Sequence, residues 1–238
     1  MNITLIGYGK MGKAIEAIAL EKGHHIVLTI DITNSNELTI ENLKKSDVAI
    51  EFTSPDIAVN NILKCLDAGV PIVSGTTGWL DRLTEVKQIC TEKKGTFLWT
   101  SNFSIGVNIF FEINKYAASL MSRYDQYDVS IEETHHTQKK DSPSGTAITI
   151  AEQVLQKITR KKNWVNNPTL NPPDLEIISK RIDPAAGTHK ISYTSSVDDI
   201  ELIHTAHNRQ GFAEGAVLAA EFLQNKKGIF TMKDVLGF

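Results

Sequence analysis

The chain has only two cysteines, Cys65 and Cys90, among its 238 residues, which is too few for a disulfide framework. It also has no excess of basic residues: 25 Lys and Arg stand against 28 Asp and Glu, and the net charge is −3. Its longest uncharged run that could imitate a membrane span, residues 95–111, carries six Thr, Ser or Asn residues. These absences predict a protein with neither nucleic-acid nor membrane partners.

The amino terminus has no basic region followed by an apolar segment and a cleavage signal, so we expect the protein in the cytoplasm. Hydrophobic residues make up 41% of the chain and charged residues 22%, which is typical of a globular protein with a packed core. A chain of this length forms one large domain or two modest ones.

The first hundred residues alternate between short apolar runs and segments of helical spacing. Apolar runs at residues 2–6, 24–30, 47–52, 71–74 and 96–100 are separated by segments long enough for a helix, as at residues 13–21, 57–66 and 80–94. Such alternation predicts parallel strands joined by helical crossovers, and therefore a doubly wound sheet.

The pattern changes after this point. We expect a helix at residues 105–121, a strand at 127–133, a helix at 144–158, a loop at 161–173 and then strands at 175–181, 189–194 and 200–206. Successive strands without helices between them predict antiparallel pairing. The apolar helix at 212–223 would return to the first domain. The predicted fold class is α/β, with a dinucleotide-binding domain of residues 1–103 and 208–238 and a second α+β domain of residues 104–207.

A glycine turn lies between the first strand and the first helix. Gly7, Gly9 and Gly12 form the pattern Gly-x-Gly-x-x-Gly, in which backbone amides and a helix N-terminus receive a pyrophosphate. Asp31 follows 19 residues after Gly12, at the end of the next strand, where a carboxylate binds ribose hydroxyls. No cation follows Asp31 directly, which favours NADH over NADPH, although Lys10 could reach the adenosine side.

Two further loops follow strands of the same predicted sheet. They are Phe52-Thr53-Ser54-Pro55 and Gly75-Thr76-Thr77-Gly78, and both could line the cofactor groove, because ligands bind at the carboxyl ends of strands in open α/β sheets. Ordinary turns, with Ser or Thr capping the next helix, would explain either loop equally well.

Residues 132–147 hold the highest density of chemically active side chains. His135 and His136 have no third metal ligand at a recognised spacing, and nearby lysines such as Lys139 would oppose a cation, so we expect no metal. Imidazole and ammonium groups this close favour binding of a dicarboxylate and proton transfer. Residues 144–146 offer hydroxyls and amides at a helix N-terminus, a suitable seat for a carboxylate. His24 and His25 are expected at the surface, at the start of a strand, and the later histidines, His189, His204 and His207, are expected to be structural.

Together these residues resemble the dihydrodipicolinate reductase family of the diaminopimelate and lysine pathway, over nearly the whole chain. The resemblance is carried by residues 133–147, Gly75-Thr76-Thr77-Gly78, residues 102–108 and the ending Met232-x-Asp234-Val235-Leu236. The glycine turn is one residue shorter than the family's common form, little sequence separates Asp31 from Asp47, and the loop Ile182–Gly187 differs from the usual family loop.

The resemblance implies a Rossmann domain, a substrate domain whose sheet builds a homotetramer, and reduction of 4-hydroxy-tetrahydrodipicolinate with NADH, or alternatively NADPH. It implies that His135 is the catalytic acid/base, that Lys139 is the proton donor, and that substrate carboxylates contact His136, Gly145 and Thr146. The implied cofactor contacts are Gly7, Gly9, Lys10, Met11, Gly12, Asp31, Phe52, Thr53, Gly75, Thr77, Ser101, Asn102 and Phe103.

Two other functions fit part of the sequence. Another two-domain NAD-dependent dehydrogenase, acting on an amino acid or a semialdehyde, would explain the glycines but not the cluster between His135 and Thr146. A non-catalytic NAD-binding sensor would keep Asp31 and the glycines, but it would not need both His135 and Lys139.

Overall fold

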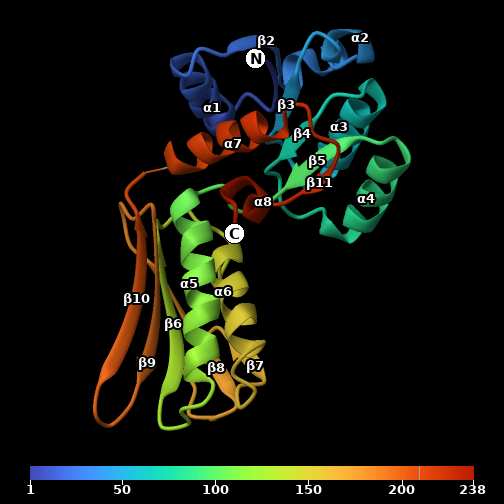
Figure 1. Cartoon of the computed structure of the whole chain (residues 1–238). Coiled ribbons are helices and arrows are strands. Elements are labelled where there is room, and N and C mark those ends of the chain that lie inside the picture. Colours follow the sequence, from blue (N-terminus) through green and yellow to red (C-terminus); the bar gives the residue numbers. More distant parts are fainter. Residues whose placement is uncertain (209) are drawn as a thin grey trace. The chain divides into compact units, whose positions relative to one another are not determined.

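A computed structural model describes residues 1–208 and 210–238. The chain divides into two compact units (Figure 1). Unit 1 comprises Met1–Ile105 together with Gln210–Phe238, and unit 2 runs from Gly106 to Arg209. Within the described residues, no helix is long and apolar enough to cross a membrane.

Unit 1 is built on a six-stranded sheet in which every pair of neighbours is parallel. The strand order is β11-β5-β4-β3-β1-β2, so the chain changes direction across the sheet between β1 and β3. The strands are β1 (Asn2–Ile6), β2 (His25–Ile30), β3 (Val48–Glu51), β4 (Ile72–Ser74), β5 (Thr96–Trp99) and β11 (Gly228–Phe230). The predicted doubly wound sheet is confirmed, with β11 as an additional edge strand.

Helices connect these strands as the spacing of apolar residues predicts. They are α1 (Lys10–Glu21), η1 (Ile32–Glu37), α2 (Ile40–Leu43), α3 (Pro55–Ala68), η2 (Leu80–Arg82), α4 (Leu83–Glu92), α7 (Gln210–Leu223) and α8 (Met232–Leu236). In α3, Pro55 occupies the first turn, where its missing N–H costs nothing, and Gly69 ends the helix in a left-handed conformation with φ of 72°. The expected helix at residues 80–94 instead begins with the 3₁₀ turn η2.

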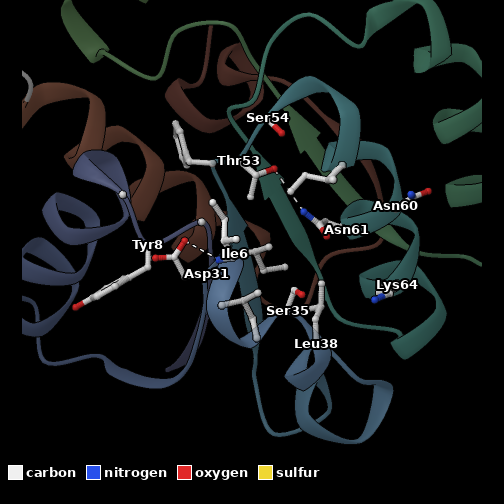
Figure 2. Close-up of a pocket in the computed structure, with 16 residues that line it drawn as sticks. Ile6, Tyr8, Asp31, Ser35, Leu38, Thr53, Ser54, Asn60, Asn61 and Lys64 are labelled. Carbon is white, nitrogen blue, oxygen red and sulfur yellow. Dashed lines mark hydrogen bonds between the residues drawn. The ribbon is translucent and has the colours of Figure 1, made fainter.

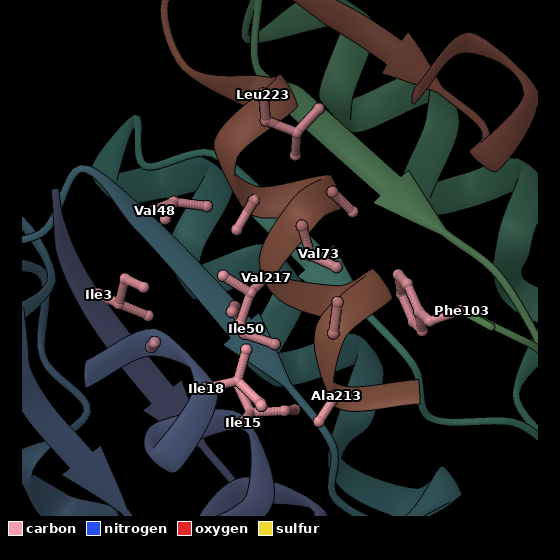
Figure 3. Packing of buried hydrophobic residues seen from close by; sticks show 14 of the residues in the cluster. Ile3, Ile15, Ile18, Val48, Ile50, Val73, Phe103, Ala213, Val217 and Leu223 are labelled. Carbon is pink, nitrogen blue, oxygen red and sulfur yellow. The ribbon is translucent and has the colours of Figure 1, made fainter. Parts of the chain in front are cut away.

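Helices cover both faces of the unit 1 sheet. On one face, α1 and the returning helix α7 enclose a core that contains Ile3, Val73 and Leu223 (Figure 3). On the other face, α3 and α4 pack their apolar sides on the sheet through a second core that includes Cys65 and Cys90. The carboxyl ends of the strands stay uncovered by these helices, because each helix starts from that edge.

Unit 2 contains a five-stranded mixed sheet of order β10-β9-β6-β8-β7. Its elements are α5 (Ile105–Met121), β6 (Asp128–His135), α6 (Gly145–Leu155), β7 (Asn163–Val165), β8 (Asp174–Arg181), β9 (Gly187–Thr194) and β10 (Asp199–Ala206). Helices α5 and α6 pack on one face of the sheet through a core that includes Phe110, Ile131 and Tyr193. Together the two units confirm the predicted α/β fold class.

Two local expectations for unit 2 were wrong. The expected loop at residues 161–173 contains the short strand β7, which pairs with β8. The strands β8 and β9 are successive in the chain, but β6 lies between them, parallel to β8 and antiparallel to β9. The loop from Ile182 onward therefore crosses the end of β6, where the Ile182 N–H donates to the His135 carbonyl at 2.8 Å.

The return of α7 to the unit 1 sheet gives a test of the fold. Leu223 has no exposed surface, so Leu223→Ala leaves a cavity and should lower the free energy of unfolding by about 2–5 kcal/mol. Leu20 on α1 is 55% exposed, and Leu20→Ala should change the same quantity by less than about 0.5 kcal/mol. Urea unfolding of both variants measures the difference, and equal effects would contradict burial of α7.

Candidate active site

The glycine turn after β1 is shaped by two close backbone approaches. Gly7 has a φ of +97°, and a Cβ atom there would lie 1.9 Å from the Phe52 carbonyl oxygen. A Cβ atom on Gly12 would lie 2.2 Å from the Gly7 carbonyl oxygen, so helix α1 can approach the turn only because this side chain is absent. The turn thus meets the steric requirements of a dinucleotide fingerprint at a helix N-terminus.

A cavity of about 420 Å³ lies beside this turn, at the switch point of the sheet (Figure 2). It is lined by the turn, the end of β2 with Asp31, the end of β3 with Phe52 and Thr53, and one face of α3. Asp31 caps the following 3₁₀ helix, since its Oδ1 accepts the Ile32 N–H at 2.8 Å.

The same cavity contains a cation that the sequence reasoning missed. Lys64 lines it from α3, 33 positions beyond Asp31 in the chain, together with Asn60 and Asn61 (Figure 2). No sequence motif identifies these three residues, because they reach the cavity only through the packing of α3 against the sheet.

A second cavity, of about 480 Å³, continues along the carboxyl ends of β3 and β4. Predicted cofactor residues line the two cavities: Gly7, Gly9, Lys10, Met11, Gly12, Asp31, Phe52, Thr53, Gly75 and Thr77. The remaining three lie outside the lining of these cavities. Ser101 is exposed, Asn102 is buried, and the Phe103 side chain belongs to the core beside α7, 5.6 Å from the Phe52 ring centroid.

In unit 2, the chemically active cluster is organised by Glu133, whose side chain is fully buried on β6. The Ser144 N–H donates to its Oε1 at 3.1 Å, and Arg181 Nη2 lies 3.4 Å from the same oxygen. On the other side, Oε2 lies 3.4 Å from His135 Nδ1 and 3.7 Å from His189 Nε2. One carboxylate therefore joins strands β6, β8 and β9 to the start of α6.

Burial and charge set the protonation of this cluster. Burial would raise the pKa of Glu133, but hydrogen bonds from Ser144 and Ser179 and the nearby His135 lower it below its ordinary value. Burial lowers the pKa of His135, a shift that Glu133 opposes and Lys139 reinforces. Burial, reinforced by His135, lowers the pKa of His189 to about 3. At neutral pH both imidazoles are therefore neutral beside an ionised carboxylate.

Lys139 lies in the turn that follows His135 and His136. Its N–H donates to the His136 carbonyl at 3.1 Å, and its ammonium contacts both carboxylate oxygens of Asp141 at 2.9 Å. Burial would raise the pKa of Asp141, but the hydrogen bond from Lys139 lowers it. This bidentate contact keeps an ammonium group within the same segment as the buried imidazole.

Residues 144–146, where a carboxylate seat is expected, form the start of α6. Ser144 caps the helix, since its Oγ accepts the Ala147 N–H at 3.2 Å, and no atom lies within 4 Å of the position of a Cβ on Gly145. An anion can thus approach the backbone of Gly145 and Thr146 without a steric barrier.

One expectation about the other histidines needs correction, and one residue lies at an unexpected place. His189, expected to be structural, faces Glu133 across the β6–β9 pair, and its ring centroid lies 5.1 Å from that of His135. His24 was expected at the surface, but its Nε2 lies 2.9 Å from Glu221 and its side chain is only 14% exposed. The strand register, invisible in the sequence, determines the first of these contacts.

Glu133, His135 and His189 each offer one ligand atom, and these atoms lie within 4.8 Å of one another. Arg181 lies against Glu133, and the charge of Lys139 acts on both histidines, so the cluster is surrounded by cations that would repel a metal ion. The expectation that this site works without a metal stays a prediction.

Comparison with known proteins decides the family. The family model for the N-terminus of dihydrodipicolinate reductase matches residues 1–103, and the model for its C-terminus matches residues 106–236. The chain belongs to the dihydrodipicolinate reductase family. It is accordingly an NAD(P)H-dependent oxidoreductase, and the alternatives of another dehydrogenase and a non-catalytic sensor give way to this assignment.

Relatives in this family match the chain along its length. A 4-hydroxy-tetrahydrodipicolinate reductase of Christiangramia forsetii is 48% identical over 236 residues, covering 99% of this chain and 98% of that protein. A protein with the same name from Methanococcoides burtonii is 37% identical, covering 88% and 81%. A dipicolinate-bound dihydrodipicolinate reductase from Paenisporosarcina shares the fold, with a TM-score of 0.77, 24% identity and 97% coverage of both chains.

The buried histidines generate a prediction about pH and stability. Between pH 6.5 and about 3 the unfolded chain binds a proton on His189 that the folded chain does not, so stability is lost as the pH falls through this window. The slope from one such group reaches about 1.4 kcal/mol per pH unit, and His189→Gln should reduce it. Denaturant unfolding followed by fluorescence of Trp164, which lies in unit 2, measures the slope. An identical slope in the variant would exclude His189 as its source.

Proposed function

We propose that this chain reduces 4-hydroxy-tetrahydrodipicolinate to tetrahydrodipicolinate in diaminopimelate and lysine biosynthesis, with His135 and Lys139 as its catalytic residues. The observation that carries this assignment is the buried carboxylate of Glu133, which joins the imidazole of His135 to the N-terminus of α6. This geometry supports the proposal, because a histidine able to transfer a proton and a helix N-terminus able to bind an anion contact the same carboxylate. A dicarboxylate with an unsaturated ring requires both.

The roles of the cofactor and of the protein follow from the chemistry of the reduction. The bound nicotinamide supplies a hydride to the unsaturated ring, and the protein must supply the balancing proton and hold the two carboxylates. The Lys139 ammonium donates the proton, while the neutral imidazole of His135 serves as acid/base beside it. The amides of Gly145 and Thr146, with His136, hold a substrate carboxylate at the start of α6.

We assign nucleotide binding to residues 1–103 and 208–238, and substrate binding and oligomerisation to residues 104–207. The cradle around Gly7 and Gly12 fits a pyrophosphate, because both glycines allow the backbone to approach closely. Asp31 would bind the adenine ribose, and the remaining cofactor contacts are those predicted from the sequence, including the segment Ser101–Phe103. We further propose that the protein is cytoplasmic.

Activity provides the direct test of the catalytic assignment. With the unaltered protein, the absorbance of the reduced nicotinamide should fall only when substrate is supplied. If this absorbance does not fall, the proposed function is refuted. His135→Gln and Lys139→Ala should each lower kcat about 10²–10⁴-fold and leave the Kd for NADH nearly unchanged, because both side chains act on the substrate. Lys140→Ala, an exposed neighbour, is the matched control and should keep its activity. Parallel loss of NADH affinity would contradict the assignment.

The cofactor preference can be tested separately. NADH should be used at least as well as NADPH, because Asp31 repels a 2′-phosphate. Asp31→Ala should move the ratio of kcat/KM values about fivefold toward NADPH, since two unit charges about 4 Å apart in water interact by roughly 1 kcal/mol. Measurements at equal salt decide this. A marked NADPH preference in the unaltered protein would mean that Lys64 or Lys10 outweighs the carboxylate.

We also propose a homotetramer. The sheet of unit 2 ends at strand β10, which leaves Ile200 and Ile203 exposed at 43% and 57%, and such a free, partly apolar edge favours association with other copies. Light scattering should give a mass close to four times 26.3 kDa. A stable monomer at micromolar concentration is the contrary result.

A further inference from the structure

Glu51 is the last residue of strand β3, and it has no exposed surface. Four donors surround its carboxylate. The Ser74 hydroxyl donates at 2.6 Å, the Thr76 hydroxyl at 2.7 Å and the Thr53 N–H at 3.0 Å, and the Thr53 hydroxyl also donates to it. Because all of these partners donate, the buried side-chain oxygens of Glu51 are satisfied by the hydrogen bonds that they accept.

These hydrogen bonds fix the hydroxyl groups of Thr53 and Thr76. A hydroxyl has one hydrogen, and in both threonines it is directed at Glu51. The oxygens can then only accept: Thr76 Oγ1 accepts the Thr53 N–H at 2.8 Å, and Thr53 Oγ1 accepts from the Asn61 amide at 3.4 Å. Neither hydroxyl can donate to a phosphate oxygen, because its single hydrogen is already directed at Glu51.

The backbone of Thr76 is held from the opposite side. Its carbonyl oxygen accepts hydrogen bonds from the indole N–H groups of Trp79 and Trp99, both at 2.8 Å. The two indoles also pack edge to face, with ring centroids 6.2 Å apart. The loop after β4 is thus fixed to the loop after β3 through Glu51, and to β5 through Trp99.

These two loops form the wall of the 480 Å³ cavity that continues from the glycine turn. Asp31 and the adenosine side lie in the other cavity, at the end of β2. A dinucleotide that places its pyrophosphate on the turn must therefore extend its second nucleoside toward Thr53 and Thr76. At these positions the wall is formed by two threonines whose hydroxyls are turned toward Glu51.

We propose that Glu51 is a positioning residue for the cofactor: it holds the loops after β3 and β4 in the shape that receives the nicotinamide half, and it restricts Thr53 and Thr76 to accepting hydrogen bonds. This inference rests on the proposed use of NAD(P)H. The backbone amides of the glycine turn suit the pyrophosphate, which leaves the loops after β3 and β4 for the nicotinamide half.

The test compares three variants of the full-length protein. Glu51→Gln removes the carboxylate and Thr76→Val removes one of its donors, while Thr4→Val removes a buried hydroxyl that bonds Ser46 elsewhere in the same sheet. Thr4 lines neither cavity, which makes it a matched control for the loss of a buried hydroxyl. Calorimetry with NADH probes both cavities, and AMP probes the adenosine side alone.

Glu51→Gln and Thr76→Val should raise the Kd for NADH about tenfold or more and change the Kd for AMP less than twofold. Thr76→Ser, which restores the hydroxyl, should bind NADH more tightly than Thr76→Val. The emission of Trp79 and Trp99 should shift in Glu51→Gln and Thr76→Val, but not in Thr4→Val.

Two results would overturn the inference. If the unaltered protein binds NADH and both variants bind it equally well, Glu51 only stabilises the fold. If the Kd values for NADH and for AMP rise in parallel, the effect is not local to the nicotinamide half. Failure of the proposed function is a separate result, namely absence of substrate-dependent turnover by the unaltered protein.

Discussion

The arrangement of the candidate site depends on one buried carboxylate, that of Glu133, whose charge must be balanced by nearby hydrogen-bond donors and cations. Glu133 has no contact with water, so its charge is stable only while Ser144, Arg181 and the two histidines remain around it. The N-terminus of α6, His135 and the strand order of unit 2 therefore depend on the same carboxylate. Moving any of these partners would leave an anion in the core.

Unit 1 also contains a buried glutamate, Glu51, but its hydrogen-bond partners differ from those of Glu133. Glu51 lies at the end of a central strand and is also fully buried, but its partners are hydroxyls and an amide rather than ionisable groups. The side chain of Glu51 therefore joins two loops, while Glu133 opposes the lowering of the His135 pKa that burial causes.

The electrostatics of the substrate cluster explain why a lysine and a histidine can act together. Burial keeps His135 neutral, and the cation nearby reinforces this, so the imidazole has a free lone pair at neutral pH. Lys139 contacts both carboxylate oxygens of Asp141. A neutral imidazole and an ammonium group in one segment are the combination that the proposed acid/base chemistry needs.

The sequence by itself determined the parallel sheet, the glycine turn, Asp31 and the segment around His135, because each follows from local periodicity or from a contiguous motif. Only the tertiary structure decided where Glu51, Lys64 and His189 lie. Strand register brings His189 to Glu133, and helix packing brings Lys64 to the cavity beside the glycine turn. The insertion of β6 between β8 and β9 was likewise missed, because pairing between strands distant in sequence depends on which apolar faces the helices cover, and no local pattern records that choice.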